Sequence, residues 1–185
     1  MGMLTASQIQ KDWEAGVIEI TPFDPAQLNI NSYDLRIGDT YKIIKTAAPG
    51  LCMDPHNIRI DTKEIVEYEE RDIPEYGMQL QPGELYLIPT LERVGTDYYI
   101  PMVTGRSSLG RIGVSVHCEA GFGDIGYHGV WTLQLKSTYK TVIYPYTRVA
   151  QVYFMTPVGE IDTLYHGKYQ GAAGASGSKL HVDLN

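Results

Sequence analysis

The amino-acid sequence predicts an all-β fold class, mainly strands with one short N-terminal helix. Nineteen glycines, ten prolines and fourteen tyrosines among 185 residues favour strands joined by many turns. Short apolar runs recur at intervals of roughly 8 to 14 residues, and no helical pattern separates them. This spacing is typical of a barrel or a folded sandwich. We expect a single domain over residues 1–166, which is long enough to bury one core.

The expected helix lies near the start of the chain. Thr5 and Gln8 have the spacing of a capping box, in which two side chains bond to the first turn of a helix. Gly16 can end the helix, because glycine readily adopts the conformation that follows a last helical turn. The apolar residues at helical spacing are Ile9, Trp13 and Val17.

Strands and turns are expected from residue 31 onward. The predicted strands are residues 41–44, 65–68, 78–80, 85–88, 98–103, 130–135, 141–144 and 149–154. The polar segment 57–72 is expected to be a surface insertion. Residues 167–185 are expected to form a flexible tail, because glycine, alanine and serine dominate its first part.

Charge and composition exclude several classes of function. The formal net charge of −7 argues against nucleic-acid binding, which depends on Lys and Arg neutralising phosphates. Cys52 and Cys118 are too few for a disulfide scaffold. The sequence contains neither an apolar run of about 18 residues nor a signal-peptide pattern. We therefore expect a soluble, cytoplasmic protein that binds neither nucleic acid nor membrane.

Residues 105–111 form the densest candidate site for an anion. This segment holds Arg106, Ser107, Ser108 and Arg111 between glycines. Arginine binds phosphate with paired donors, serine adds a hydroxyl, and glycine lets backbone N–H groups approach an oxygen. The segment lacks the pattern of a nucleotide-binding P-loop. A charged turn before a helix is the competing interpretation.

A second candidate lies in the glycine-rich segment 120–129. Asp124 can activate a water there, and Tyr127 can cover a sugar or a base. A turn cap and a surface aromatic residue are the competing interpretation. His117 and Glu119 match part of a zinc deaminase motif, but the later pair of cysteines is missing, so we expect no catalytic zinc.

Taken in order, five segments between residues 4 and 171 resemble the superfamily that joins dCTP deaminases, bifunctional dCTP deaminase/dUTPases and trimeric dUTPases. They are residues 31–38, 105–113, 120–129, 150–154 and 168–171. The resemblance implies a distorted β-barrel of jelly-roll or β-clip type, as in dUTPases. It also implies a homotrimer with active sites between subunits, and Mg²⁺ held through the triphosphate rather than by a protein metal site.

The resemblance also assigns roles to residues. It implies that Ser107, Ser108 and Arg111 hold phosphates and that Arg106 supports them or contacts phosphate. Asp124 is expected near the sugar, orienting the attacking water, and the tail is expected to close over the nucleotide. The expected catalytic residues are Asp124, Gln134, Arg111 and Ser107. The further expected substrate contacts are Arg106, Ser108, Ala120, Tyr127, Thr132, Leu133, Tyr165, Lys168 and Tyr169.

Two positions depart from the deaminase pattern. Gln134 stands where the resemblance implies a proton-shuttling glutamate, and Ala172 replaces a second glutamine in the tail. A glutamine amide cannot accept a proton near neutral pH, and loss of a general acid–base costs roughly 10²–10⁴-fold in rate. These departures favour a dUTP diphosphatase, which releases dUMP and pyrophosphate.

Three alternatives stay open. One is a dCTP deaminase, or a bifunctional dCTP deaminase/dUTPase. Another is a diphosphatase for a different pyrimidine triphosphate, such as dCTP or a modified base. The last is a non-catalytic nucleotide-binding regulator, against which the water-positioning Asp124 argues.

Overall fold

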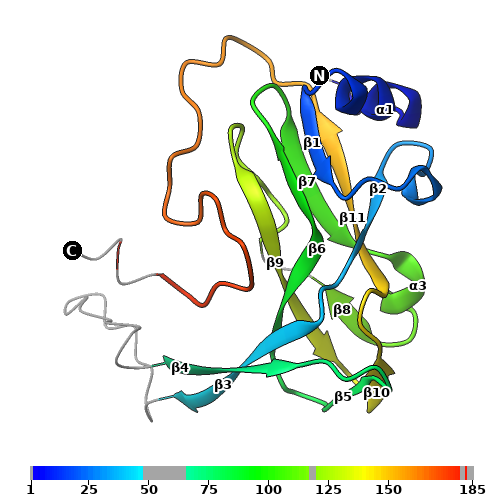
Figure 1. Ribbon diagram of the computed structural model, residues 1–185, viewed down its shortest axis with the longest axis vertical. Helices are drawn as coiled ribbons and strands as arrows, with labels where there is room; N and C mark the ends of the chain where they lie inside the picture. The colour runs from blue at the N-terminus through cyan, green and yellow to red at the C-terminus, as the bar shows by residue number, and fades with distance from the viewer. Residues whose placement is uncertain (1, 48–65, 117–119, 180–181, 183–185) are drawn as a thin grey trace.

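The computed structural model describes residues 2–47, 66–116, 120–179 and 182 (Figure 1). Most of the predicted insertion, both cysteines, His117 and Glu119 lie outside the described residues. Among the described residues, no helix has the length and apolar composition needed to cross a membrane.

One α-helix, α1 (Ala6–Glu14), stands at the start of the chain as predicted. Thr5 is its N-cap, but the Thr5 hydroxyl lies 3.1 Å from the Ser7 hydroxyl and makes no capping bond. The Gln8 amide donates to Asp12 at 2.9 Å instead of reaching back to Thr5. The helix therefore forms without the predicted capping box. Gly16 follows it with a φ of 73°, where glycine is favoured.

In the described part of the chain, antiparallel strands form three sheets. The largest runs in the order β4-β3-β6-β9-β8, with β1 also paired to β6, and the others are β2-β11-β7 and β10-β5. The bounds are β1 Ile18–Thr21, β2 Tyr33–Arg36, β3 Thr40–Ala47, β4 Val66–Asp72, β5 Met78–Leu80, β6 Tyr86–Thr96, β7 Ile100–Gly105, β8 Val114–Val116, β9 His128–Ser137, β10 Thr141–Ile143 and β11 Arg148–Met155. The described residues also form two short helical turns, η1 (Pro25–Gln27) and α3 (Ser107–Gly110). The mainly β class is confirmed, although the three sheets do not close into one barrel.

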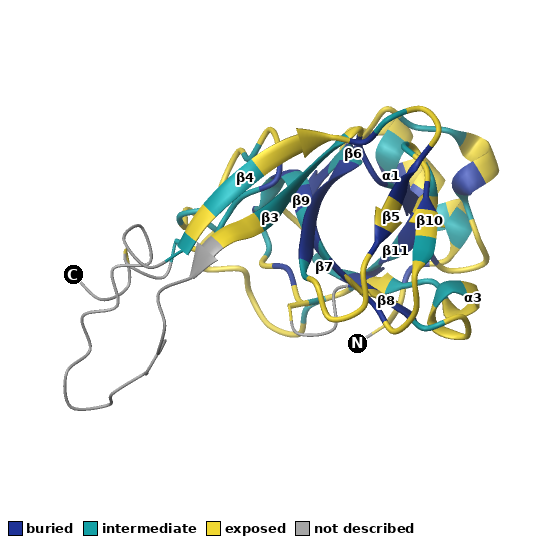
Figure 2. Cartoon of the chain, turned by 90° about the horizontal axis from the view of Figure 1, so that it is seen from below, coloured by how far each residue is buried: buried dark blue, intermediate teal, exposed yellow. Residues whose placement is uncertain are grey.

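The hydrophobic core lies between the sheets. Tyr33 and Leu35 of β2, Ile88 of β6, Leu133 of β9 and Phe154 of β11 are fully buried. Figure 2 marks long stretches of β6 and β9 as buried. Burial of such side chains stabilises a fold by roughly 1.5–3 kcal/mol each.

A buried ion pair joins two of the sheets. Glu92 of β6 has no exposed surface, and it accepts hydrogen bonds from Arg36 Nε at 2.7 Å and from the Arg36 backbone at 2.8 Å. Gln27 of η1 donates to the same carboxylate at 3.0 Å. A carboxylate stripped of water needs such partners, so Glu92 fixes β2 and η1 against β6.

Replacement of Glu92 by alanine should lower the free energy of unfolding by about 3–5 kcal/mol, because Arg36 and Gln27 lose a buried partner. Urea unfolding followed by circular dichroism measures the change. The control is Glu67→Ala, which breaks an exposed pair with Lys45 (3.3 Å) and should change stability by about 0.5 kcal/mol at most. Equal losses in the two variants would contradict this role of Glu92.

Candidate functional site

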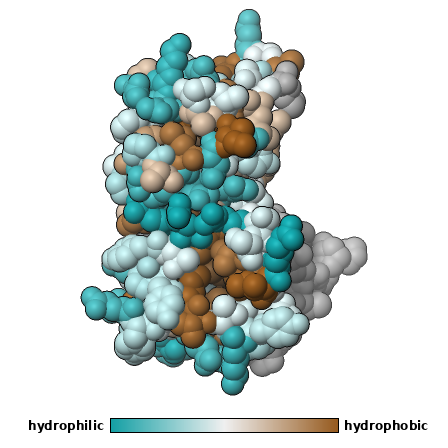
Figure 3. Space-filling model, turned by 90° about the vertical axis from the view of Figure 1, so that its right-hand side faces the viewer, coloured by the Kyte–Doolittle hydropathy of each residue, from teal (hydrophilic) through white to brown (hydrophobic). Residues whose placement is uncertain are grey.

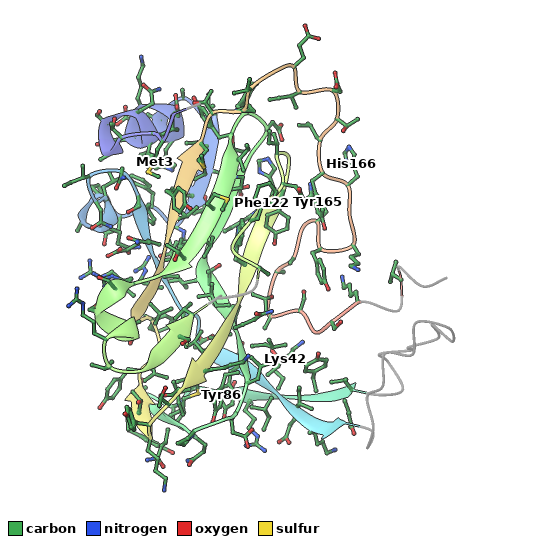
Figure 4. All side chains as sticks on the ribbon, turned by 180° about the vertical axis from the view of Figure 1, so that it is seen from behind. Met3, Lys42, Tyr86, Phe122, Tyr165 and His166 are labelled. Atoms are coloured by element: carbon green, nitrogen blue, oxygen red, sulfur yellow. The ribbon has the colours of Figure 1, made fainter. Side chains whose placement is uncertain are left out.

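A cavity of about 480 Å³ lies between β9 and the tail. This volume is within the range of pockets that bind small molecules, roughly 300–1,000 Å³. Figure 4 places Phe122 and Tyr165 close together between the strands and the tail, and both line the cavity. The cavity is therefore walled by strands on one side and by the tail on the other.

Strand β9 supplies one wall of the cavity through its two-residue period. Val130, Thr132 and Gln134 are partly exposed and line the cavity, whereas Leu133 is fully buried in the core. Because the Leu133 side chain is buried in the core, the predicted substrate contact of Leu133 stays a prediction for its backbone alone. The Gln134 side chain has no hydrogen-bond partner among the described residues, so its amide donors and acceptor are free for a ligand.

The glycine-rich turn carries the acidic residue of the site. Asp124 is exposed and lines the cavity, and its side chain makes no hydrogen bond with the described residues. Gly126 has a φ of 91°, and a Cβ at Gly123 would lie 2.4 Å from the Trp131 ring. Glycine is therefore required at both positions, on either side of the carboxylate that they help to place.

Tyr127 forms the inner side of this turn. Its hydroxyl donates to the Val130 carbonyl at 2.8 Å, and its ring lies edge-on to Trp131 at 5.4 Å and to Tyr165 at 5.8 Å. Burial, and to a lesser extent Tyr165, raises the pKa of Tyr127 to about 12. The phenol is thus neutral near pH 7, where it packs and donates but does not accept protons.

The tail covers the open edge of β9. Among the described residues, strand β8 pairs with residues 135–137 of β9, and the tail bonds to the first half of β9. There the Val130 N–H donates to the Ala172 carbonyl at 2.8 Å, and the Gly171 N–H donates to the His128 carbonyl at 3.0 Å. The Ser176 N–H donates to Thr132 Oγ1 at 2.9 Å. The tail thereby forms the second wall of the cavity.

Two tyrosines hold the far part of the tail. The Ser178 N–H donates to the Tyr68 hydroxyl of β4 at 3.2 Å, and the Lys179 N–H donates to the Tyr169 hydroxyl at 3.0 Å. The ammonium groups of Lys168 and Lys179 lie 5.7 and 5.3 Å from the centre of the Tyr169 ring. Cation–π contact of this kind places two positive charges beside the cavity.

The predicted phosphate-binding segment lies elsewhere. Figures 1 and 4 show α3 on the opposite side of the strands from the tail. Ser107, Ser108 and Arg111 are exposed there, and their side chains bond to no described residue. Within a single chain, residues 106–111 therefore do not reach the cavity.

The cavity contains most of the other predicted residues. They are Ala120, Asp124, Tyr127, Thr132, Gln134, Tyr165 and Tyr169. Lys168 lies in the tail beside Tyr169 but does not line the cavity. Sequence reasoning missed Tyr68, Leu87, Phe122, Trp131 and Ser176. The alternation of β9 could have indicated that its even-numbered residues share a face. Tyr68 lies in a predicted strand, but nothing in the sequence places that strand beside the cavity, and Ser176 comes from a segment without a pattern.

Two properties of the lining limit its chemistry. Asp124 is the one carboxylate among the described residues that line the cavity, and none of them is Lys or Arg. Within the described part of the chain, no three His, Cys, Asp or Glu residues are grouped so that they could hold a metal ion. The cavity suits a largely neutral, flat group near one carboxylate, and polyphosphate binding requires cations from outside it.

Comparison with known proteins gives consistent relatives. A family model described as dCTP deaminase-like matches residues 3–156. A protein of Clostridium botulinum (strain Eklund 17B / Type B), named dCTP deaminase, dUMP-forming, is 40% identical over 167 residues, which is 90% of each chain. A protein of Leptospira biflexa serovar Patoc with the same name is 36% identical over 182 residues, which is 98% of each chain.

One solved structure resembles the fold. It is the crystal structure of 2'-deoxycytidine 5'-triphosphate deaminase from Agrobacterium tumefaciens, with a TM-score of 0.65 and 20% sequence identity. The match covers 84% of this chain and 48% of that one, so this chain spans about half of that protein. The likeness supports the fold.

The raised pKa of Tyr127 predicts a loss of stability in alkali. From pH 10.0, the ordinary pKa of tyrosine, to about 12, the unfolded chain loses the Tyr127 proton first, so the free energy of unfolding falls as pH rises. Tyr127→Phe should make this fall shallower, as measured by urea unfolding at several pH values. Burial also raises the pKa of Tyr33 to about 12, so Tyr33→Phe should act in the same direction. Identical pH profiles for the wild type and Tyr127→Phe would contradict the prediction.

Proposed function

Because the chain belongs to the dCTP deaminase-like family, we propose that it binds dCTP and converts it to dUMP, ammonia and pyrophosphate. The observation that carries this proposal is the activity for which the relatives are named. Proteins 36–40% identical to this chain, over at least 90% of its length, are named dCTP deaminase, dUMP-forming. The bifunctional dCTP deaminase/dUTPase, raised as an alternative from the sequence, therefore agrees better with the relatives than the dUTP diphosphatase does.

The preference for a dUTP diphosphatase was wrong. It rested on Gln134 and Ala172, and the deaminase names of the relatives overturn it. Two departures were given more weight than the rest of the deaminase pattern. An amide in the pocket removes one route for a proton, but it leaves the cavity, the carboxylate of Asp124 and the hydrogen-bonding edge of β9 unchanged.

Deamination, in this proposal, takes place against β9. Thr132 and Gln134 line the cavity beside the edge on which the base would lie. A water molecule adds to C4 of the cytosine ring, and the amino group leaves as ammonia. The free Gln134 amide can donate to one ring atom and accept from another, so it orients the ring. Water carries the proton to the leaving group, because an amide cannot do so.

Asp124 serves the second reaction, in which pyrophosphate is released. Its carboxylate is exposed in the cavity and unpaired among the described residues, so it can hold a water by hydrogen bonds. That water attacks the α-phosphorus, and the bond from this phosphorus to the bridging oxygen breaks. Pyrophosphate leaves, and dUMP remains. Tyr127 and Tyr165 enclose the same end of the cavity and exclude bulk water.

Mg²⁺ is expected through the triphosphate. One carboxylate beside the cavity fits an ion that binds through substrate phosphates and keeps several waters, and it does not fit an all-protein metal site. When bound, the ion neutralises charge that develops on the phosphate oxygens. The residues of this chain that would share that task are Ser107, Ser108 and Arg111.

The distance between the predicted phosphate-binding segment 106–111 and the cavity supports an active site shared between two chains. The cavity has no lining cation among the described residues, while Ser107, Ser108 and Arg111 are exposed on the opposite side of the strands. We propose a homotrimer in which α3 of one copy faces the cavity of the next. Figure 3 views the side that carries α3 and shows apolar patches among polar side chains. Ile112, next to Arg111, is 54% exposed.

The remaining expectations stay predictions. They are a cytoplasmic location and the absence of nucleic-acid and membrane partners. The tail is expected to move when nucleotide enters, since Ala172 and Ser176 occupy backbone and side-chain groups of β9 beside the cavity.

Product analysis tests the proposed reaction. With dCTP and Mg²⁺, the protein should release ammonia, pyrophosphate and dUMP, measured by an ammonia assay, a pyrophosphate assay and nucleotide chromatography. Asp124→Asn should lower pyrophosphate release by roughly 10²–10⁴-fold, because an amide activates water poorly. Gln134→Glu should raise the rate of ammonia release, because a carboxylate can accept and return a proton. If dCTP yields no ammonia with either the wild type or Gln134→Glu, the proposal is wrong.

Mixing two inactive variants tests the shared site. Arg111→Ala and Asp124→Asn should each abolish most pyrophosphate release. After the two are unfolded and refolded together in equal amounts, roughly a quarter of the sites should combine an intact Asp124 with an intact Arg111 from a neighbour. Activity should therefore return in the mixture. A mixture as inactive as its parts would place both residues in one chain's site.

A further inference from the structure

The side chain of Asp34 lies beneath the start of α3. Asp34 is 2% exposed, and its Oδ2 lies 3.3 Å from Arg106 Nη2 and 3.6 Å from Arg148 Nη1. Its Oδ1 accepts a hydrogen bond from Asn29 Nδ2 at 2.9 Å. We propose that Asp34 is a positioning residue for triphosphate binding, which holds Arg106 and Arg148 side by side toward the phosphates. This inference rests on the proposed function.

The contacts of Asp34 join four segments of the chain. Arg106 is the N-cap of α3, Arg148 begins β11, and Asn29 follows η1. Arg106 Nη1 donates to the Arg148 carbonyl at 3.4 Å, and the Arg106 backbone donates to the Val149 carbonyl at 3.1 Å. A buried carboxylate is stable only with such partners, so the position of Asp34 and the positions of both arginines depend on one another.

The other side of Asp34 is anchored in the core. Gln27 Nε2 donates to the Asp34 carbonyl at 2.7 Å and to Glu92 at 3.0 Å. Glu92 in turn binds Arg36, two residues further along β2. Asp34 is thus linked through Gln27 to the buried ion pair that joins the sheets, which anchors its backbone in the core. A rigid carboxylate of this kind fixes flexible side chains before a ligand arrives.

The charges of Asp34, Arg106 and Arg148 do not cancel. Two guanidinium groups face one carboxylate, so the cluster carries a net charge of +1. The arginine side chains are 33% and 47% exposed, which leaves donors that Asp34 does not use. Arg106 precedes Ser107 and Ser108, whose hydroxyls are exposed. Donors that are ordered in advance bind a polyphosphate more tightly, because less conformational entropy is lost on binding.

Asp34→Asn tests the proposal, since it keeps the size of the side chain and an oxygen for Asn29 but removes the charge. The KM for dCTP should rise about tenfold, with kcat changed by less than about twofold. The inhibition constant of pyrophosphate should rise by a similar factor, while that of deoxycytidine, which has no phosphate, should not change. The control Asp39→Asn, at an exposed aspartate that accepts from Tyr146 at 3.0 Å, should leave all three values unchanged.

A double-mutant cycle separates positioning from a general effect on the fold. In an Arg106→Lys background, Asp34→Asn should raise the KM by clearly less than tenfold, because one of the two arginines through which Asp34 acts is already altered. A full additional tenfold rise, a fall in kcat alone, or an equal weakening of deoxycytidine would overturn the proposal.

Two measurements keep the test independent of folding and of the reaction. If Asp34→Asn does not fold, Arg148→Gln can be tested instead, since Arg148 is the more exposed of the two arginines that Asp34 contacts. This variant should weaken pyrophosphate binding severalfold, as measured by calorimetry. Unchanged binding would overturn the proposal. Calorimetry with pyrophosphate also needs no turnover. Weaker pyrophosphate binding by Asp34→Asn, in a protein that releases no ammonia from dCTP, would refute the proposed reaction but support the positioning role.

Discussion

Strand β9 must serve two environments at once, because its successive side chains point to opposite faces of the sheet. Leu133 and Leu135 pack into the core, while Val130, Thr132 and Gln134 line the cavity, and Trp131 contacts both. The same strand pairs with β6 along one edge and with β8 and the tail along the other. A shift of one residue in its register would turn the core residues outward and remove the cavity wall. The packing of the core therefore also fixes the geometry of the site.

Most strands were predicted from their apolar runs. Residues 130–135 and 149–154 fall within β9 and β11, and the short strands β5 and β10 were also predicted, at residues 78–80 and 141–144. Strands β1, β2 and β8 were missed, because they have only three or four residues and their pairing depends on partners far along the chain. The arrangement of the strands in three sheets also could not be read, because it depends on long-range pairing and on bulges such as the one between Arg148 and Ala150.

The candidate site was predictable where residue type carries the chemistry. Asp124 and Tyr127 were found because a carboxylate and an aromatic ring stood in a glycine-rich turn, and both line the cavity. Ser176 was not, because it contributes a backbone N–H, which every residue except proline has. The function was misjudged for a related reason. Gln134 was read as a missing carboxylate, whereas residue identity alone does not say what other groups and waters do in a pocket.

The hydrogen bonds between the tail and β9 have a consequence for the chain's behaviour in concentrated solution. The backbone groups of His128 and Val130 would otherwise form an unpaired strand edge, and such edges pair with strands of other molecules and start aggregates. The segment that covers the cavity is thus also a protective cover for the sheet. Whenever the tail moves away to admit a ligand, the backbone edge of β9 is exposed and can pair with a strand of another molecule. Selection for fast release and selection against self-association therefore act on the same few residues, Gly171, Ala172 and Ser176.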